Sequence, residues 1–266
     1  MVEIKETRKK LDATMFAQKA ADAGITAVFC MGGDGTANET INGLLRARKH
    51  PQFGFIPLGT VNDLARALKI PLEPSDAIRE LDRANSLKID IGKANERYFT
   101  NGVAIGTLPE AILDVSPEEK TRFGSLAYFF KGIRSIKRQR VYRFHIETDE
   151  TTFCVDSPLI VVSLTNSLGS FERFMPDVAV NDGKMWLSIF QPFGFFGTLK
   201  IVLHLLCGRL DKSGLVTVQS VKRVKINTTC FKTLPTNVDG DRGPDLPLKI
   251  EILPSFLRIF VPAKKG

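Results

Sequence analysis

Glycine and aspartate residues gather where a predicted strand gives way to a predicted helix in the N-terminal third of the chain. The apolar, β-prone segment 26–30 leads into a run from Gly32 to Gly35 that holds three glycines and Asp34. Glycines let backbone N–H groups approach an anion closely, and a helix N-terminus adds partial positive charge. Because Asp34 would repel a phosphate directly, the run indicates a nucleotide site in which Mg²⁺ lies between carboxylate and phosphate.

Two familiar glycine motifs do not account for this run. A P-loop requires Gly, four residues and then Gly-Lys-Ser/Thr, and the chain contains no such run. A dinucleotide fingerprint requires a third glycine where Asn38 stands.

A second loop of similar character spans residues 57–63, between a strand-like run and a short helical segment. Its Thr60 could bind phosphate or ribose, and its Asp63 could join Asp34. The alternative is ordinary turn chemistry, with Asn62 or Thr60 capping the following helix. Loops of this kind open at the carboxyl edge of a parallel sheet, where such sheets bind ligands.

The elements that must position these loops follow from the periodicity of the chain. Up to Asp90 it predicts an α/β unit with a parallel sheet, with helices near 12–23, from 37, from 62 and near 75–84. After Ile91 the pattern predicts a largely antiparallel β domain, interrupted by helices near 124–137 and 196–205. The strands expected there are 98–105, 143–147, 159–164, 185–190, 216–221, 222–227, 249–252 and 257–261.

Length and composition agree with a globular protein of two domains. The chain has 266 residues, of which 43% are hydrophobic and 25% charged. Its four cysteines stand far apart in apolar stretches without metal spacing, which indicates reduced thiols in a cytoplasmic protein. No signal peptide follows Met1, and the apolar run 190–207 is too interrupted for a good membrane span.

The net charge of +8 and the pI near 9.3 favour an anionic partner. Basic and aromatic residues concentrate in 123–143, a pattern that suits an anionic membrane surface, although a solvated helix face explains it as well. Zinc-finger and RNA-binding signatures do not occur, so nucleic acid is not expected as a partner.

The two loops, together with Asn-Val-Asp-Gly-Asp at 237–241, resemble the diacylglycerol kinase catalytic-domain superfamily. Further matches lie at 89–93, 164–167 and 176–183, and the finer pattern is most similar to the soluble bacterial diacylglycerol kinases. The resemblance implies an α/β nucleotide-binding domain at 1–91 and a β-sandwich lipid and catalytic domain at 92–256. It also implies that the last strand, near 257–266, can return to the first domain.

For activity, the resemblance implies an ATP- and Mg²⁺-dependent lipid kinase, with diacylglycerol as the favoured acceptor and phosphatidic acid as the product. Such an enzyme would be cytoplasmic and peripheral to the inner face of the membrane. No motif selects among diacylglycerol, sphingoid base, phosphatidylglycerol and undecaprenol.

The resemblance also assigns roles to residues of this chain. Asp239 becomes the general base toward the lipid hydroxyl, although Asp239-Gly240 would also suit a plain hairpin turn. Asp34, Asp63 and Asp90 become an acidic network at the metal–phosphate site. The nucleotide-binding residues are Gly32, Gly33, Asp34, Gly35, Thr36, Asn38 and Thr60.

A second, structural Mg²⁺ is implied at the loop 179–184. The Asp182 carboxylate and the backbone carbonyls of Ala179 and Lys184 would hold it, and oxygen ligands from one tight loop suit this ion. The run 181–183 would equally form a hairpin turn.

The beginning of the chain departs from the family pattern. Family members open with a strand that ends in an Asn-Pro-x-Ser-Gly-like turn, whereas residues 1–7 resemble the family's second strand. The expectation is a nucleotide site that lacks one wall and a sheet edge that invites association into a homodimer. Two alternatives therefore stay open: a small-molecule kinase similar to NAD kinase, which shares the Gly-Gly-Asp-Gly loop, and a truncated, inactive lipid-binding protein.

Overall fold

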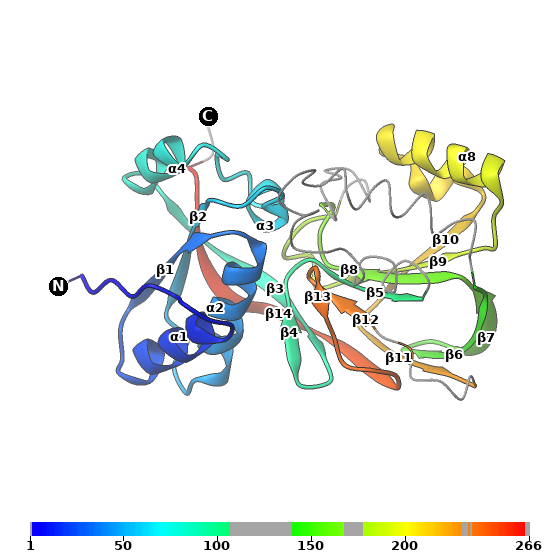
Figure 1. Ribbon diagram of the computed structural model, residues 1–266, viewed down its shortest axis with the longest axis horizontal. Helices are drawn as coiled ribbons and strands as arrows, with labels where there is room; N and C mark the ends of the chain where they lie inside the picture. The colour runs from blue at the N-terminus through cyan, green and yellow to red at the C-terminus, as the bar shows by residue number, and fades with distance from the viewer. Residues whose placement is uncertain (1, 107–139, 168–177, 230–233, 235, 264–266) are drawn as a thin grey trace.

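The computed structural model of the protein describes residues 2–106, 140–167, 178–229, 234 and 236–263. Two lobes lie side by side along the longest axis (Figure 1). Helices surround a small parallel sheet in the N-terminal lobe, and strands dominate the C-terminal lobe. The basic segment predicted as a helix near 124–137 lies outside the described residues.

The N-terminal lobe alternates helices and strands, as its sequence pattern predicts. The strands β1 and β2 pair in parallel, with Ala27 opposite Gln52. Helix α1 packs closely on α2, and this approach requires glycine because a Cβ atom on Gly43 would collide with the carbonyl oxygen of Thr14. The elements are α1 (Asp12–Asp22), β1 (Ala27–Gly32), α2 (Asp34–Arg46), β2 (Gln52–Pro57), α3 (Asp63–Ala67) and α4 (Pro74–Leu81).

The strands of the C-terminal lobe form two sheets. One has the order β10-β9-β8-β5-β12-β13, and all its neighbouring strands are antiparallel. The elements after α4 are β3 (Asn85–Ala94), β4 (Arg97–Phe99), β5 (Gly102–Gly106), β6 (Tyr142–Thr148), β7 (Thr152–Ser157), β8 (Leu159–Ser163), β9 (Met185–Phe190), α8 (Phe195–Leu206), the 3-10 helix η1 (Leu210–Ser213), β10 (Val216–Val221), β11 (Arg223–Thr228), β12 (Thr236–Val238), β13 (Asp241–Arg242) and β14 (Leu248–Val261).

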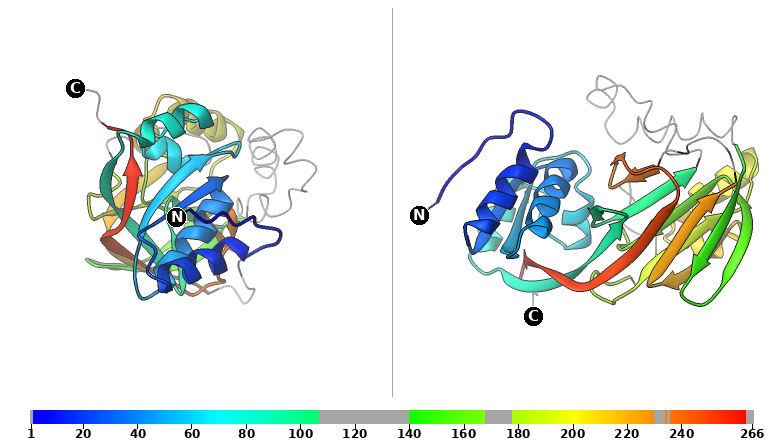
Figure 2. Two further views of the ribbon diagram at one scale, coloured as in Figure 1. Left: turned by 90° about the vertical axis from the view of Figure 1, so that its left-hand side faces the viewer. Right: turned by 90° about the horizontal axis from the view of Figure 1, so that it is seen from below.

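The other sheet runs through both lobes, because β14 and β3 are long strands that extend from one lobe to the other (Figure 2). Near its start β14 pairs with β11 in the C-terminal lobe, and near its end Ile259 lies opposite Phe53 of β2, in parallel. The register of β14 against β3 shifts between Leu253 and Leu257. These shared strands join the two lobes through continuous backbone pairing.

Each lobe has its own hydrophobic core. Ile41, Leu44 and Phe53 of the N-terminal lobe pack with Leu257 and Ile259 of β14. In the C-terminal lobe the inner faces of the two sheets meet around a core that includes Phe144, Ile146, Ile160, Met185, Leu187 and Ile226. The predicted fold class, a parallel α/β unit followed by an antiparallel β domain, is therefore confirmed.

Several element boundaries differ from the sequence predictions. Helix α2 begins at Asp34 rather than Ala37, because Gly33 is extended and stands at the N-cap. The strand expected over 98–105 is two strands, β4 and β5, and the strands expected at 249–252 and 257–261 are parts of the single strand β14. Of the segment 1–7, which resembles the family's second strand, the described residues 2–7 are exposed and form no strand.

Candidate active site

The two glycine-rich loops predicted to bind nucleotide lie in direct contact. A Cβ atom on Gly59 would lie 2.6 Å from the Cα atom of Gly33, so this approach requires glycine. The backbone N–H of Leu58 donates a hydrogen bond of 2.7 Å to the carbonyl oxygen of Gly32. Thr60 is exposed beside this contact. Residues from both loops therefore share one surface at the carboxyl ends of β1 and β2.

Asn62 holds the second loop in shape and connects it to the first. Its backbone adopts the left-handed conformation (φ 54°), and its side chain accepts from the Gly59 N–H and donates to the Gly59 carbonyl oxygen. The side chain does not cap α3, so that reading of Asn62 is wrong. Its backbone N–H instead donates to Oδ2 of Asp34 at 2.7 Å.

Asp34 carries an unsatisfied charge at this junction. Its Oδ1 atom is buried and accepts no hydrogen bond from the described residues. Burial, followed by the nearby carboxylates of Asp63 and Asp239, raises the pKa of Asp34 to about 6, even though the Asn62 N–H opposes the rise. A buried carboxylate oxygen without a donor, close to other carboxylates, is an environment that a cation would stabilise.

Asp63 connects the second loop to the other lobe. The hydroxyl of Ser167 donates to Oδ1 of Asp63 at 2.8 Å, and both side chains are buried. Ser167 belongs to the Leu-Thr-Asn-Ser run at 164–167, which directly follows β8. Through Ser167, this run therefore fixes the position of the Asp63 carboxylate.

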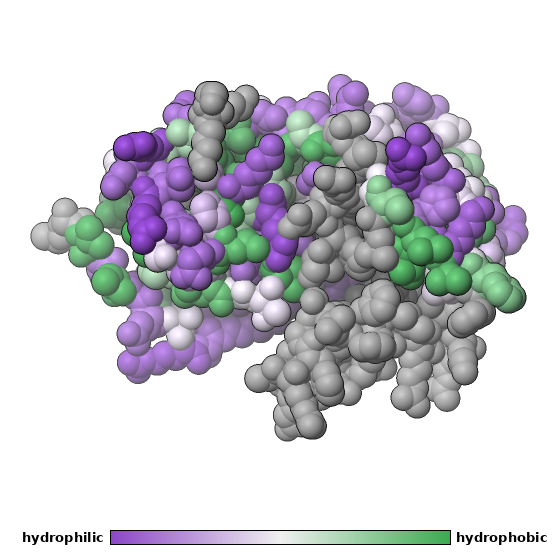
Figure 3. Space-filling view, turned by 90° about the horizontal axis from the view of Figure 1, so that it is seen from above, coloured by the Kyte–Doolittle hydropathy of each residue, from purple (hydrophilic) through white to green (hydrophobic). Residues whose placement is uncertain are grey.

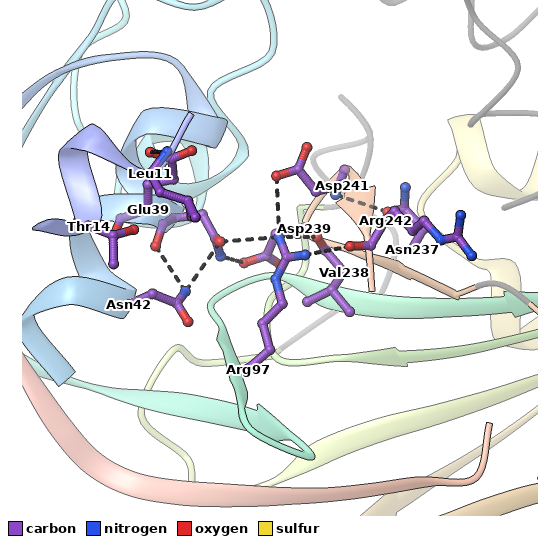
Figure 4. Close-up of polar contacts among 12 residues, drawn as sticks. Leu11, Thr14, Glu39, Asn42, Arg97, Asn237, Val238, Asp239, Asp241 and Arg242 are labelled. Carbon is purple, nitrogen blue, oxygen red and sulfur yellow. Dashed lines mark hydrogen bonds and ion pairs between the residues drawn. The ribbon is translucent and has the colours of Figure 1, made fainter. Parts of the chain in front are cut away.

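Asp239 extends from the C-terminal lobe toward α2 (Figure 4). Asp239 and Gly240 both have positive φ and form the two-residue turn between β12 and β13, so the hairpin reading is also correct. The turn conformation does not explain the side chain. Its Oδ2 atom accepts from the Asn38 amide at 2.7 Å and from the Thr100 N–H at 2.8 Å.

The other oxygen of Asp239 is equally well satisfied. Oδ1 accepts from the backbone N–H groups of Asn101 and Gly102, each at 2.9 Å. Burial raises the pKa of the Asp239 carboxyl, and these backbone donors together with the Arg97 cation oppose the rise. The backbone N–H groups between β4 and β5 thus fix the carboxylate, and the Asn38 amide connects it to the first turns of α2.

Arg97 holds the hairpin that carries Asp239, a role that sequence reasoning missed. From β4 its guanidinium donates to the Arg242 carbonyl oxygen at 2.6 Å and pairs with Asp241 at 3.3 Å, as Figure 4 shows. It also lies 3.4 Å from the carbonyl oxygen of Val238. The Arg97 guanidinium therefore contacts both strands of the hairpin, Val238 before the Asp239 turn and Asp241 and Arg242 after it.

Asn42 provides a second connection that sequence reasoning missed. Its amide donates to the Asn38 and Tyr98 carbonyl oxygens, and its Oδ1 atom accepts from the Tyr98 N–H. Asn38 and Asn42 are buried one turn apart on α2. Buried amides at i and i+4 of a helix are a sequence signal for a polar contact, and here that contact positions Asn38 for Asp239.

Asp90, expected in a network with Asp34, has other partners. Its carboxylate accepts from the backbone N–H groups of Gly183 and Ser255, each at 2.7 Å. Asp182 lies close enough that the charge of Asp90 raises its pKa, after burial as the larger cause. The Asp182 carboxylate accepts from the Lys184 N–H at 3.0 Å. The structure thus brings Asp34, Asp63 and Asp239 together and places Asp90 with the loop 179–184.

The donor set suits Mg²⁺ held partly by a substrate. Within the described part of the chain, no three His, Cys, Asp or Glu side chains are grouped closely enough to hold a metal. Mg²⁺ commonly keeps waters and binds through one or two carboxylates plus substrate phosphates. The unsatisfied Oδ1 of Asp34, with Asp63 nearby, fits that mode of binding.

A cavity of about 460 Å³ lies beside Asp63, at the contact between the lobes. It is lined by the end of α3, the segment 69–72 and the residues Asn166 and Ser167, and it includes the cations Arg66 and Lys69. The phenylalanine-rich segment 190–196 contributes Phe190 and Phe193 to a separate hydrophobic core.

Comparisons with known proteins match this arrangement over nearly the whole chain. Residues 1–94 match the diacylglycerol kinase catalytic domain, and residues 110–261 match the YegS C-terminal NAD kinase beta sandwich-like domain. A diacylglycerol kinase of Staphylococcus carnosus is 34% identical over 256 residues, which cover 96% of this chain and 83% of the relative. A diacylglycerol kinase of Staphylococcus aureus is also 34% identical, over 96% of this chain and 81% of its own length.

A solved structure supports the fold. The crystal structure of a diacylglycerol kinase from Bacillus anthracis superposes with a TM-score of 0.82 at 24% identity, covering 97% of this chain and 84% of that one. The two matched ranges cover both lobes and include the positions of the two loops and of the Asp239 hairpin. The chain therefore belongs to the diacylglycerol kinase family of lipid kinases.

Proposed function

We propose that the protein is an ATP- and Mg²⁺-dependent kinase that converts diacylglycerol to phosphatidic acid at the inner face of the cytoplasmic membrane. The observation that carries the proposal is the contact between Asp239 and Asn38, which joins the hairpin of one lobe to the glycine-loop helix of the other. A base placed beside a phosphate-binding loop is the arrangement that phosphoryl transfer to a hydroxyl requires.

The roles of the residues follow from their positions. The loops around Gly33 and Gly59 bind the triphosphate through backbone N–H groups, with Thr60 exposed beside them. Asp34 and Asp63 hold Mg²⁺, which when bound neutralises charge on the phosphates. In the two-domain arrangement the acceptor hydroxyl approaches from the side of the C-terminal lobe.

Asp239 acts on the acceptor. Its carboxylate takes the proton of the lipid hydroxyl while the hydroxyl oxygen forms a bond to the γ-phosphorus and the bond from that phosphorus to ADP breaks. In the structure both carboxylate oxygens already accept hydrogen bonds, so the incoming hydroxyl replaces one donor. The weakest of these donors is the Thr100 hydroxyl, at 3.2 Å from Oδ2.

Replacing Arg97 by alanine should lower kcat about tenfold to a hundredfold with a smaller change in KM for ATP, because the hairpin loses the cation that contacts both its strands. The loss of this cation also removes an interaction that lowers the pKa of Asp239. The acidic limb of the kcat–pH profile should therefore move to higher pH. Steady-state kinetics between pH 5 and 9 measure both effects.

Two further variants make this test specific. Arg97→Lys keeps the charge and should restore the pH profile more fully than it restores kcat, since lysine lacks the planar fork. Arg242→Ala removes a neighbouring cation whose side chain is largely exposed, and it should leave both parameters near wild type. An Arg97→Ala profile identical to that of wild type would contradict the positioning role.

The acceptor is tested by incubating the protein with γ-labelled ATP, Mg²⁺ and one candidate at a time: short-chain diacylglycerol, sphingoid base, phosphatidylglycerol, undecaprenol or NAD. We expect label in phosphatidic acid. Preferential label in another lipid would keep the kinase class and replace the substrate, and label in NAD would favour the small-molecule alternative. Lipid binding without transfer to any acceptor would favour the inactive alternative.

A further inference from the structure

Helix α8 is apolar on two opposite sides. On one side Ile201 and Leu205 pack into a core with Leu210 and Val216. On the other side three large apolar side chains are exposed: Phe196 by 82%, Leu199 by 52% and Leu203 by 54%. A helix that is hydrophobic around most of its circumference is typical of burial on all sides, yet these three apolar side chains of α8 are exposed.

The exposed residues form one stripe. Phe196, Leu199 and Leu203 follow one another at intervals of three and four, which places them on one face of the helix, and the exposed Cys207 at its C-cap continues this spacing. We call these four residues the α8 stripe. Figure 3 shows apolar residues gathered over the end of the molecule that carries α8. Contiguous exposed apolar surface of this kind marks an interaction site.

The charged residues of α8 and of the sequence leading to it are cationic. The sequence contains no Asp or Glu from Gly183 to Leu210. Lys200 is exposed on α8, and Arg209 and Lys212 are exposed just beyond its end. The first acidic residue after this span of sequence is Asp211, within η1. An apolar stripe with cations beside it is complementary to a bilayer that contains anionic lipids.

The length of α8 decides how it can meet a bilayer. Its 12 residues extend about 18 Å, well short of the roughly 30 Å hydrocarbon core. In the described part of the chain no helix is long and apolar enough to cross a membrane. A short helix of this composition is suited to lie in the interfacial plane, with its apolar face among the acyl chains.

We propose that the α8 stripe docks the protein on an anionic lipid bilayer and so presents the C-terminal lobe to its lipid substrate. The proposal deepens the proposed function and rests on it only for the identity of the substrate. The partner is the bilayer surface. A second copy of the chain covering the same stripe is the outcome that would replace it.

Flotation with lipid vesicles in the absence of ATP tests the docking. The protein should float with vesicles of phosphatidylcholine containing phosphatidylglycerol, and less with phosphatidylcholine alone. The double variant Leu199→Ser/Leu203→Ser should partition about tenfold or more weakly, because two side chains no longer enter the acyl region. Ile78→Ser, which removes an exposed apolar residue of α4 (47% exposed), should bind as wild type does. Equal binding by both variants would overturn the proposal.

Two exposed cysteines allow a direct measurement of insertion. An environment-sensitive fluorophore at Cys207, on the stripe, should shift to shorter wavelength when anionic vesicles are added. The same fluorophore at Cys154, exposed on β7, should not shift. Each probe is placed with the other exposed cysteine and Cys230 replaced by serine. A shift at both positions, or at neither, would contradict docking through α8.

Two controls separate this proposal from its alternatives. If the stripe mediates self-association instead, sedimentation equilibrium without lipid will show a dimer that the double serine variant loses, and vesicle binding will be unchanged. Kinase activity toward short-chain diacylglycerol in detergent micelles, where no bilayer is needed, should survive in the double variant. Loss of vesicle binding with retained micellar activity supports the docking role, whereas vesicle binding without activity in wild type would contradict the proposed function alone.

Discussion

Asp239→Asn should lower kcat by about a hundredfold to ten-thousandfold while leaving the fold intact, since it removes a general base. Asparagine tolerates the positive φ of this turn position. Its side-chain oxygen can still accept the backbone N–H groups on one side of the carboxylate. The variant should therefore retain its circular dichroism and its affinity for ATP, which separates chemistry from structure.

Asp241→Asn is the matched control for Asp239→Asn. Asp241 lies on the same hairpin, two residues further on, and pairs with Arg97 at 3.3 Å at a partly exposed position. It should keep kcat within a few-fold of wild type, because an exposed ion pair contributes little. Full turnover by Asp239→Asn, or an equal loss in both variants, would remove the assignment of Asp239 as base.

The sequence predicted those parts of the fold that local patterns specify. The strand–loop–helix units of the N-terminal lobe follow from apolar periodicity and from glycine at the turns, and they lie where predicted within a few residues. The continuity of β14 was missed because Pro254 and Ser255 interrupt its pattern, and Ser255 has a positive φ of 51°. Strand β3, which is distant in sequence, pairs with β14 both before Leu253 and after Leu257, so the two segments form one strand.

The sequence located most of the candidate site but not its supports. Asp34 and Asp63 stand in loops between a predicted strand and a predicted helix, so pattern alone pointed to them, whereas the family resemblance pointed to Asp239. Arg97 and Asn42 stand in an ordinary strand and an ordinary helix, and only the tertiary pairing of β4 with α2 and the hairpin gives them a role. Long-range contacts of this kind leave no local signal beyond a buried amide.

Asp90 illustrates the limit of motif reasoning. Its motif predicts an acidic residue at the end of a strand, close to a site. It does not predict which loop will supply the donors, and here the loop at Gly183 and the bend at Ser255 do so. Whether Asp90 acts at the metal–phosphate site therefore stays a prediction.

Asp34→Asn should abolish Mg²⁺-dependent turnover and at the same time stabilise the protein at pH 8. The pKa of Asp34 is raised from 3.8 to about 6 by burial and by the Asp63 carboxylate, so its ionisation destabilises the fold. Two pKa units correspond to about 1–3 kcal/mol of the free energy of unfolding. Asparagine removes the charge, and its side-chain oxygen can still accept a hydrogen bond from the Asn62 N–H. Its amide nitrogen replaces Oδ1, the buried carboxylate oxygen that accepts no hydrogen bond.

The sign of the pH dependence follows from the raised pKa. In wild type the folded state holds the Asp34 proton more tightly than the unfolded chain does. Stability therefore falls as pH rises from about 4 to about 6 and is fully reduced above that range. The advantage of Asp34→Asn should vanish near pH 3.5 and reach its maximum above pH 7. Denaturant unfolding at four or five pH values measures it, and an advantage that is independent of pH would contradict the cause.

Addition of Mg²⁺ together with a non-hydrolysable ATP analogue supplies the decisive comparison. A ligand that binds only the folded state stabilises it, by about 1.4 kcal/mol at ten times its dissociation constant. Wild type should gain this stabilisation, because Mg²⁺ interacts with the Asp34 carboxylate, whose Oδ1 atom accepts no hydrogen bond. Asp34→Asn should gain much less. Asp76→Asn, which removes an exposed carboxylate of α4, should respond as wild type does. If Asp34→Asn responds equally well, the cation is held elsewhere, because a carboxylate that ligates Mg²⁺ cannot be replaced by an amide without loss of affinity.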